Sequence, residues 1–243
     1  MTATTETPGP AATAAAPAAG PLHLSRLVPD LRNREARRDL QDAYEMHRTL
    51  MRGFPDAADG GPGGRILWRT DLPPGAGPPT VLVQSESPPD WSRLPAGWLR
   101  AAAECKEWLP AFAAGRRLSF RLRANPVKCL AKGSVGADGR PVEARWVGKR
   151  VKLRDEEQQL AWLARKAADA GFRVVWAMPV AENRDGSRRV VGRKDGWALS
   201  LLAVRFEGLL TVADPAAFAA AVRAGVGPGK ALGFGLLSVA RPG

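Results

Sequence analysis

A glycine-rich stretch near the end of the chain decides the fold: Gly225-Val226-Gly227-Pro228-Gly229-Lys230-Ala231-Leu232-Gly233-Phe234-Gly235. Glycine has no Cβ atom, so this backbone can adopt positive φ angles and aim several N–H groups at a phosphate. Residues 214–223 have a helical pattern, and residues 236–239 form an apolar run typical of a strand. A dinucleotide-binding fingerprint needs the reverse order, strand then glycines then helix. The order excludes a Rossmann site. It leaves a phosphate-binding loop or a flexible connection at the end of a βαββαβ unit.

The overall composition indicates a globular protein that binds a polyanion. The chain has 243 residues, enough for one large domain or two small ones, and 45% of them are hydrophobic. Lysine and arginine number 36 against 24 acidic residues, which gives a net charge of +12. This excess favours nucleic acid over membrane, because no basic amphipathic segment of the membrane type is present. A generally arginine-rich composition is the alternative explanation.

The cysteines and the N-terminal segment show no sign of metal, disulfide or export chemistry. Cys105 and Cys129 lie in no C-x-x-C motif and have no neighbouring histidine, so we predict no metal, no cofactor and a cytoplasmic location. Residues 1–20 are mostly Ala, Thr and Pro, and no basic segment precedes an apolar core. We therefore expect a disordered tail and not a signal peptide. No apolar run approaches the roughly 20 residues of a membrane span.

A short helix is predicted where Asp42 can act as the N-cap and Glu45 occupies the third position of a capping box. Gly53 suits the position just after the end of this helix. Met46 and Leu50, four residues apart, form an apolar stripe for the core.

The same helix carries a candidate reactive pair. Tyr44 and His47 lie one turn apart on a neighbouring stripe, so both side chains can reach one reacting group. Histidine titrates near neutral pH, which suits an acid or a base. Arg48 and Arg52 form a parallel basic edge. A His–Tyr pair on a helix is more often structural than catalytic, so the pattern alone leaves both interpretations open.

Alternating residues predict the clearest strand at residues 117–126, where Leu118, Phe120 and Leu122 share one face. Arg121 and Arg123 lie on the opposite face. Other apolar or alternating runs predict strands at residues 22–28, 65–69, 81–85, 172–178, 199–212 and 236–239.

Helical spacing and end signals complete the predicted elements. Apolar residues at i, i+3, i+4 and i+7 predict a helix after residue 155, with Gly171 as its stop. Asp214 followed by Pro215 begins the last helix. Residues 183–196 are expected to be a mobile basic loop, and residues 88–115 show no clear pattern beyond a short helix.

A basic hairpin is predicted between residues 128 and 154, with a glycine-rich tip from Gly133 to Gly139. Its cations include Lys128, Arg145, Lys149, Arg150 and Lys152. Alternating cations on a ribbon suit contact along a duplex backbone, where each neutralised phosphate adds salt-dependent affinity. An exposed charged hairpin with no partner is the alternative. It is the weaker one, because no acidic residue interrupts residues 144–154.

The order of these elements predicts an α+β protein. From residue 118 onward the order is strand, hairpin, helix, strand, strand, helix, strand, which is the ferredoxin-like βαββαβ unit. From residue 22 it is strand, helix, strand, strand, an incomplete second copy. The predicted parts are a tail, a first domain with the Tyr44–His47 helix, and a second domain with the basic hairpin and the glycine-rich loop: residues 1–20, 21–100 and 116–243.

Several motifs resemble those of the CasE family, the repeat-processing endoribonucleases of type I-E CRISPR systems in the RAMP superfamily. Tyr44-x-x-His47-Arg48-x-Leu50 looks like the active-site helix of that family, and Phe120-Arg-Leu-Arg-Ala-Asn-Pro126 is the most specific match. The glycine-rich loop resembles that of RAMP proteins, with Phe234 in a position that is often cysteine. The resemblance covers residues 22–240.

The resemblance implies tandem ferredoxin-like domains and a metal-independent endoribonuclease. Such an enzyme cuts the CRISPR precursor RNA at the repeat hairpin by 2′-OH attack, leaving 2′,3′-cyclic phosphate and 5′-OH ends. Its partners are the repeat RNA and other Cascade subunits, with which it stays after cleavage. His47 is then the acid or base and Tyr44 orients or donates, with the division between them open. The rivals are a RAMP subunit that binds crRNA without cutting it and an RNA-binding protein outside CRISPR.

RNA contacts are expected from cations and glycines of both predicted domains. Three of the cations, Arg26, Arg48 and Lys230, are also candidates for stabilising charge on the phosphorane. The full set is Arg26, Arg48, Arg52, Arg121, Arg123, Lys128, Arg145, Lys149, Arg150, Lys152, Gly227, Gly229, Lys230, Gly233 and Gly235.

Overall fold

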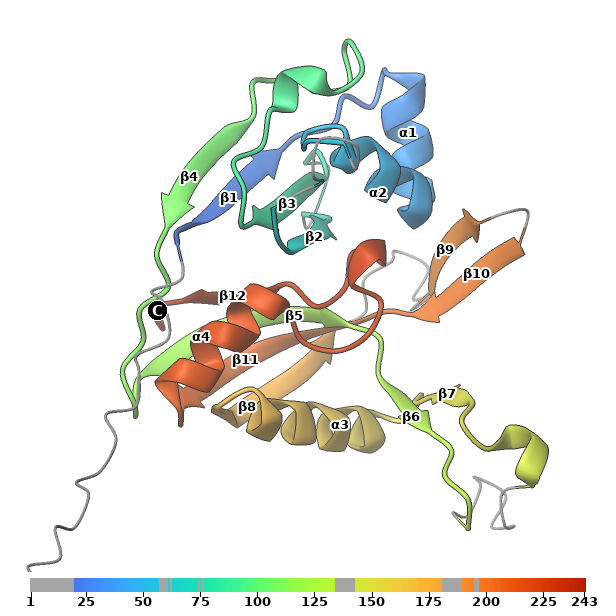
Figure 1. The fold of residues 1–243 in the computed structure, drawn as a ribbon, viewed down its shortest axis with the longest axis vertical. Helices are drawn as coiled ribbons and strands as arrows, with labels where there is room; N and C mark the ends of the chain where they lie inside the picture. The colour runs from blue at the N-terminus through green and yellow to red at the C-terminus, as the bar shows by residue number, and fades with distance from the viewer. Residues whose placement is uncertain are drawn as a thin grey trace, which may run out of the picture.

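The computed structural model describes residues 20–56, 61, 63–73, 75, 77–133, 143–180, 189–194 and 197–243. Two four-stranded sheets dominate this part of the chain, one from the N-terminal half and one from the C-terminal half (Figure 1). Two hairpins project from the C-terminal half (Figure 1). The predicted tail lies almost wholly outside the described residues. The α+β class is confirmed.

The N-terminal sheet is antiparallel, with strand order β2-β3-β1-β4. Its strands are β1 (Leu22–Leu27), β2 (Ile66–Asp71), β3 (Thr80–Ser85) and β4 (Glu104–Trp108). Helices α1 (Arg34–Gln41) and α2 (Ala43–Met51) follow β1, and the 3₁₀ helix η2 (Trp91–Arg93) separates β3 from β4. This is a ferredoxin-like unit in which a short 3₁₀ turn stands where the second helix would be.

The sequence pattern missed β4 and most of α1. In β4 every residue except Trp108 is exposed, so the strand has no apolar alternation to detect. Helix α1 is strongly polar, and the Asn33 side chain starts it by accepting the N–H of Ala36 at 3.0 Å. Because β4 pairs with β1, the N-terminal sheet extends past residue 100, where the predicted first domain ended.

The C-terminal sheet has strand order β12-β5-β11-β8 and is also antiparallel. Its strands are β5 (Arg117–Ala124), β8 (Phe172–Val180), β11 (Val204–Val212) and β12 (Leu237–Ala240), and its helices are α3 (Glu156–Asp169) and α4 (Pro215–Ala224). The chain order β5-α3-β8-β11-α4-β12 with this strand order is the complete ferredoxin-like βαββαβ unit. The prediction for this half is confirmed.

The two projecting hairpins differ from the prediction in two respects. The single strand predicted for residues 199–212 is divided at Ala203 between the second hairpin and β11, and a strand occurs where a loop was expected. Strands β6 (Val127–Cys129) and β7 (Arg150–Lys152) pair as expected, with the 3₁₀ helix η3 (Ala144–Trp146) before β7. The segment expected to be a loop instead contributes β9 (Arg189–Lys194), which pairs with β10 (Trp197–Leu202). Its short Val190-Val191 run gave too little apolar alternation to detect. The predicted glycine-rich tip, apart from Gly133, lies outside the described residues, as do residues 183–188 and 195–196.

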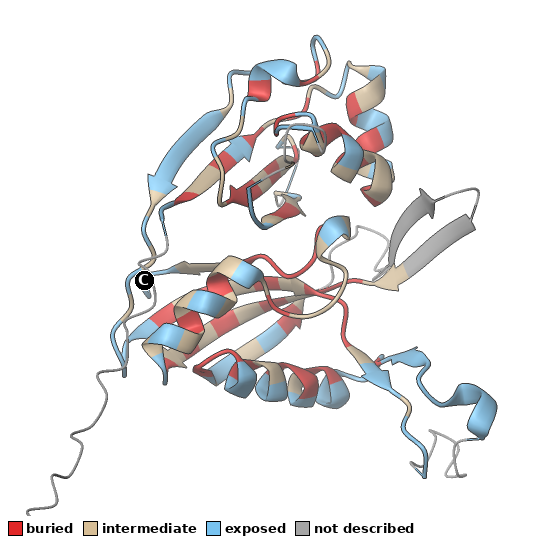
Figure 2. Ribbon diagram, in the orientation of Figure 1, coloured by how far each residue is buried: buried red, intermediate tan, exposed pale blue. Residues whose placement is uncertain are grey.

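Each sheet packs its own helices over an apolar core (Figure 2). The two cores exchange side chains, because Leu22 of β1 belongs to the C-terminal core and Phe234 of the glycine-rich loop belongs to the N-terminal one. Polar contacts join the halves as well. The Arg69 side chain, 2% exposed, pairs with Asp71 at 2.7 Å and donates to Ser238 Oγ of β12 at 3.1 Å. The halves are therefore held together by buried contacts.

Candidate active site and RNA-binding surface

Helix α2 is fixed at its start and along its inner face. Asp42 Oδ1 accepts the N–H groups of Tyr44 and Glu45 at 2.8 and 3.2 Å, which confirms the predicted N-cap. Met46 and Leu50 are buried in the N-terminal core, also as predicted. The position and rotation of α2 are thereby determined by its own sequence.

Two local predictions for this helix need correction. The N–H of Asp42 donates to the carbonyl of Arg38 in α1 at 3.0 Å, and Glu45 pairs with Arg48 at 3.1 Å, so the capping box lacks its reciprocal half. Gly53 lies after the helix end but does not have a positive φ. A Cβ atom there would lie 2.7 Å from the Trp91 ring, so packing accounts for the glycine.

Tyr44 and His47 lie on α2 outside the core, and both are half-buried. His47 Nδ1 is enclosed and has no hydrogen-bond partner among the described residues. Burial lowers the pKa of His47 below its ordinary value of 6.5, because the apolar surroundings disfavour the charged ring. The ring is therefore neutral at pH 7 and able to accept a proton.

The glycine-rich loop lies beside this helix. Its 3₁₀ helix η4 (Lys230–Leu232) contacts both α2 and β2, and α2 also contacts β9 (Figure 1). Gly225, Gly227, Gly229, Gly233 and Gly235 all have positive φ, as the composition of the loop predicts. Segments far apart in the sequence are thus brought to one place.

Close packing gives two of these glycines a second role. A Cβ atom on Gly233 would lie 2.8 Å from the Trp68 ring of β2, and one on Gly227 would lie 3.0 Å from Trp162 of α3. The loop is therefore wedged between the two halves of the molecule, which excludes the interpretation as a flexible connection.

Lys230 is the cation of this loop. Burial, and then the positive charge of Arg65, lower the pKa of the Lys230 ammonium. Among the described residues no carboxylate pairs with Lys230 or with Arg65, which immediately precedes β2. Two cations without an acidic partner attract an anion. Arg65 was not among the predicted site residues, because nothing in the sequence indicates that it lies near the glycine-rich loop.

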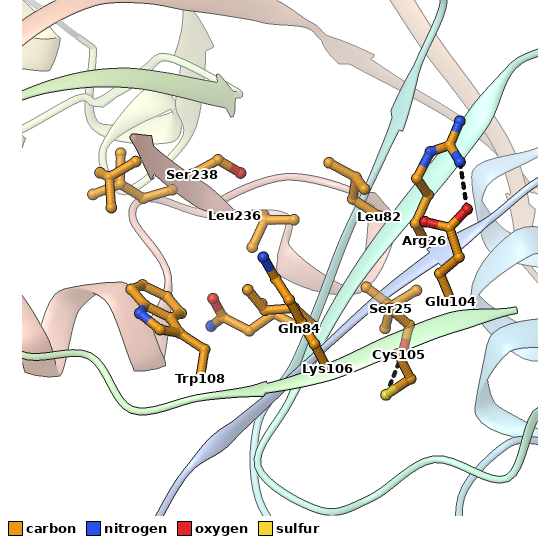
Figure 3. Close-up of a pocket in the computed structure, with 14 residues that line it drawn as sticks. Ser25, Arg26, Leu82, Gln84, Glu104, Cys105, Lys106, Trp108, Leu236 and Ser238 are labelled. Atoms are coloured by element: carbon orange, nitrogen blue, oxygen red, sulfur yellow. Dashed lines mark hydrogen bonds and ion pairs between the residues drawn. The ribbon is translucent and has the colours of Figure 1, made fainter. Parts of the chain in front are cut away.

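Arg26 lies elsewhere. It lines a groove of about 620 Å³ between the N-terminal sheet and β12, where it pairs with Glu104 at 2.8 Å (Figure 3). Its strand neighbours Ser25 and Leu27 point to the helix side, toward Trp91 and the core beneath α2. Because strand side chains alternate, Arg26 is on the opposite face of the sheet from His47. The structure does not bring it to the reactive pair, and its RNA contact stays a prediction.

The other predicted cations fall into three groups. Arg48, on α2, and Arg52, the residue that follows the helix, are exposed near the reactive pair. Arg121 is held at the joint between the halves, 2.7 Å from Glu207 and 3.5 Å from Asp71, and the Arg123 guanidinium lies over the Phe234 ring. The hairpin cations are all exposed: Lys128, Arg145, Lys149, Arg150 and Lys152.

The described residues contain no helix that is both long and apolar enough to cross a membrane. Within the same part of the chain, no three His, Cys, Asp or Glu side chains gather as a metal site would require.

Comparisons with known proteins agree with this architecture. A family described as "CRISPR associated protein" matches residues 22–241. The chain is 42% identical over 224 residues to the CRISPR-associated endoribonuclease Cse3 of Thermus thermophilus, covering 89% of this chain and 99% of the relative. It is 32% identical over 201 residues to the CRISPR system Cascade subunit CasE of Escherichia coli, covering 82% and 92%.

Comparison with a solved structure shows that the similarity to these relatives extends to the fold. Thermus thermophilus Cse3 bound to an RNA representing a pre-cleavage complex has a TM-score of 0.75 to this chain at 40% identity, over 91% of this chain and 100% of that one. Similarity in sequence and in structure thus extends over nearly the whole of both proteins. The chain belongs to the CasE family of CRISPR-associated proteins.

Proposed function

We propose that the protein is a metal-independent endoribonuclease that cuts CRISPR precursor RNA at the repeat stem-loop. The observation that carries this proposal is the pair Tyr44 and His47, one turn apart on a capped helix that contacts the loop of Lys230. Further support comes from the relatives, one named as a CRISPR-associated endoribonuclease and one as a Cascade subunit. After cleavage the protein stays on the product RNA as a subunit of Cascade.

The chemistry is an internal transesterification. The 2′-oxygen of the nucleotide before the scissile phosphate attacks phosphorus, and His47, neutral at pH 7, accepts its proton. The bond from phosphorus to the 5′-oxygen breaks, and Tyr44 donates a proton to that oxygen. The products are a 2′,3′-cyclic phosphate and a 5′-OH, without participation of water in the bond changes. His47 and Tyr44 return to their starting protonation states by exchange with solvent.

Charge on the phosphorane is stabilised by cations beside the pair. Lys230 and Arg65 lie close enough for the charge of one to lower the pKa of the other, so a bound phosphate relieves their repulsion. Arg48 and Arg52 extend this positive edge along α2. The backbone N–H groups of the glycine-rich loop at Gly227, Gly229 and Gly233 add neutral donors. The N–H of Gly235 instead donates to the carbonyl of Arg123 at 2.8 Å and holds the loop against β5.

The duplex is held through its backbone by the hairpin of β6 and β7. The hairpin projects from the C-terminal half and is largely exposed (Figure 2), so a phosphate chain can follow its exposed cations. The N-terminal unit, predicted for residues 21–100 and extended by β4, supplies the catalytic helix. The unit at residues 116–243 supplies most of the RNA surface. We place the reaction in the cytoplasm, where the transcript is available.

The test is incubation with the cognate repeat RNA in excess EDTA, followed by analysis of the product ends. We expect one cut, with 2′,3′-cyclic phosphate and 5′-OH ends, and no cut in an RNA carrying a single 2′-deoxy nucleotide before the scissile phosphate. Cleavage of the 2′-deoxy RNA, or 3′-OH ends, would contradict 2′-oxygen attack. Binding without any cleavage would support the alternative of a non-catalytic crRNA-binding subunit.

A further inference from the structure

Trp146 is an exposed aromatic residue on the projecting hairpin. It ends the 3₁₀ helix η3, and its side chain is 44% exposed. The ammonium of Lys149 lies 4.4 Å from the centre of its rings, and the guanidinium of Arg145 lies at 5.6 Å. An exposed indole with two cations close to it thus lies on the surface that we assign to RNA.

The packing of the fold does not account for this ring. Trp146 belongs to neither apolar core, whereas Trp162 is buried beside Phe206 in the C-terminal core. Every residue of β7 is exposed, so no core lies beneath the hairpin. The ring has no packing role in either core and is therefore available for contact with a ligand.

The turn that carries the ring is held by backbone hydrogen bonds. The N–H of Trp146 donates to the carbonyl of Glu143 at 2.9 Å, and its own carbonyl accepts the N–H of Lys149 at 3.1 Å. Arg145 is held in turn by Glu143, with Nε 2.8 Å from the carboxylate. The backbone that carries the indole and the Arg145 side chain are therefore held before any ligand arrives, which reduces the entropy lost on binding.

We propose that Trp146 stacks on an unpaired nucleobase of the repeat RNA while Lys149 and Arg145 neutralise the adjoining phosphates; this rests on the proposed function. Aromatic side chains stack on bases that are free of the duplex, and an A-form major groove is too deep and narrow for side chains to read. The charge of the segment selects RNA over a protein partner, because between residues 143 and 152 Glu143 is the sole acid among several cations.

The unpaired base can come from either of two parts of the repeat, the loop of its hairpin or the single strand flanking the stem. Both offer the same chemistry, a π face beside a phosphate. Stacking at either place fixes where along the RNA the protein sits. Trp146 is therefore a positioning residue that sets the register of the scissile phosphate without touching it.

The experiment uses repeat RNAs blocked by a 2′-deoxy nucleotide at the cut site, with 2-aminopurine in the loop or in the flank. The proteins are the full-length chain and its Trp146→Ala, Trp146→Phe and Trp176→Ala variants. Trp176 on β8 is the matched control, since it is 55% exposed with no cation over its ring among the described residues. Binding to a blunt stem without unpaired nucleotides is measured in parallel.

We expect stacking to quench one of the two labelled RNAs, which identifies the source of the base. Trp146→Ala should lose this quenching and bind that RNA about tenfold more weakly, while Trp146→Phe restores most of both. Trp176→Ala should match the unaltered protein. Unchanged quenching in Trp146→Ala, or an equal loss of affinity for the blunt stem, would overturn the inference. Failure of the unaltered protein to bind or cut unblocked repeat RNA would instead overturn the proposed function.

Discussion

The reactive helix and the basic hairpin are built in opposite ways. Helix α2 is capped by Asp42, anchored by buried Met46 and Leu50, and contacted by a loop wedged between both halves of the molecule. The β6–β7 hairpin has three-residue strands, exposed side chains and no core beneath it. Catalytic groups need their geometry fixed within about 0.5 Å, whereas contact with a phosphate chain tolerates movement. The difference indicates that helix α2 carries out the chemistry and that the hairpin binds the RNA.

The largest effect in this comparison is expected from removing the imidazole of His47. His47→Ala should lower the single-turnover cleavage rate about 10³-fold, since acid–base groups contribute typically 10²- to 10⁴-fold. The other histidine provides the control: His23→Ala, on β1, should leave the rate within about twofold. Quenched-flow cleavage at saturating protein measures both. Near-normal cleavage by His47→Ala would remove this residue from the mechanism.

A stability comparison separates the wedged loop from the projecting hairpin. Gly233→Ala places a Cβ atom 2.8 Å from Trp68 at a positive φ, so we expect a loss of about 3 kcal/mol of unfolding free energy. Gly133→Ala, also at a positive φ but with nothing within 4 Å, should lose about 1 kcal/mol. Urea denaturation measures both. Equal losses would mean that the loop is not tightly packed.

Acidification should affect the helix site through His47. Because burial lowers its pKa below 6.5, the neutral base persists at pH 7 and is lost only below that value. The apparent second-order rate constant for cleavage, measured at subsaturating protein, should therefore be constant above pH 7. It should fall about tenfold per pH unit once the pH is below the lowered pKa. A rate that rises on acidification would instead assign His47 as the acid.

The smallest expected effects come from single hairpin cations. Lys128→Ala and Arg150→Ala should each weaken RNA binding by about 1 kcal/mol and reduce the slope of log affinity against log salt by about one. Lys106→Ala, in the groove beside β12, serves as a control for lost charge. Filter binding from 50 to 400 mM salt measures the slopes. A slope that changes as much with Lys106→Ala would place RNA in the groove.

The sequence was informative wherever a local signal decides the structure. Alternation of Leu118, Phe120 and Leu122 defined β5, and the caps Asp42 and Asp214 located the starts of α2 and α4. Each of these signals acts within a few residues, so it can be read from one segment. The glycine-rich loop was likewise predicted to lie between the last helix and strand, and its glycines have the expected backbone.

What could not be predicted depends on contacts between distant segments. Exposed β4 is a strand because it pairs with β1, not because of its own pattern. The contact of Arg121 with Asp71 joins the two halves, and so does the closeness of Arg65 to Lys230. The exposed position of Trp146 could not be predicted either, because no periodic pattern in the sequence indicates it.

The assignment of chemistry to helix α2 and of RNA binding to the hairpin is tested most directly by measuring both cleavage rate and affinity for one variant of each element. Cleavage rate at saturating protein and affinity for the blocked repeat RNA are determined for His47→Ala and for the double variant Lys128→Ala/Arg150→Ala. We predict that His47→Ala loses about 10³-fold in rate with affinity within about twofold, and that the double variant loses about tenfold or more in affinity with its saturated rate unchanged. Equal losses of rate and affinity in both proteins would contradict the account.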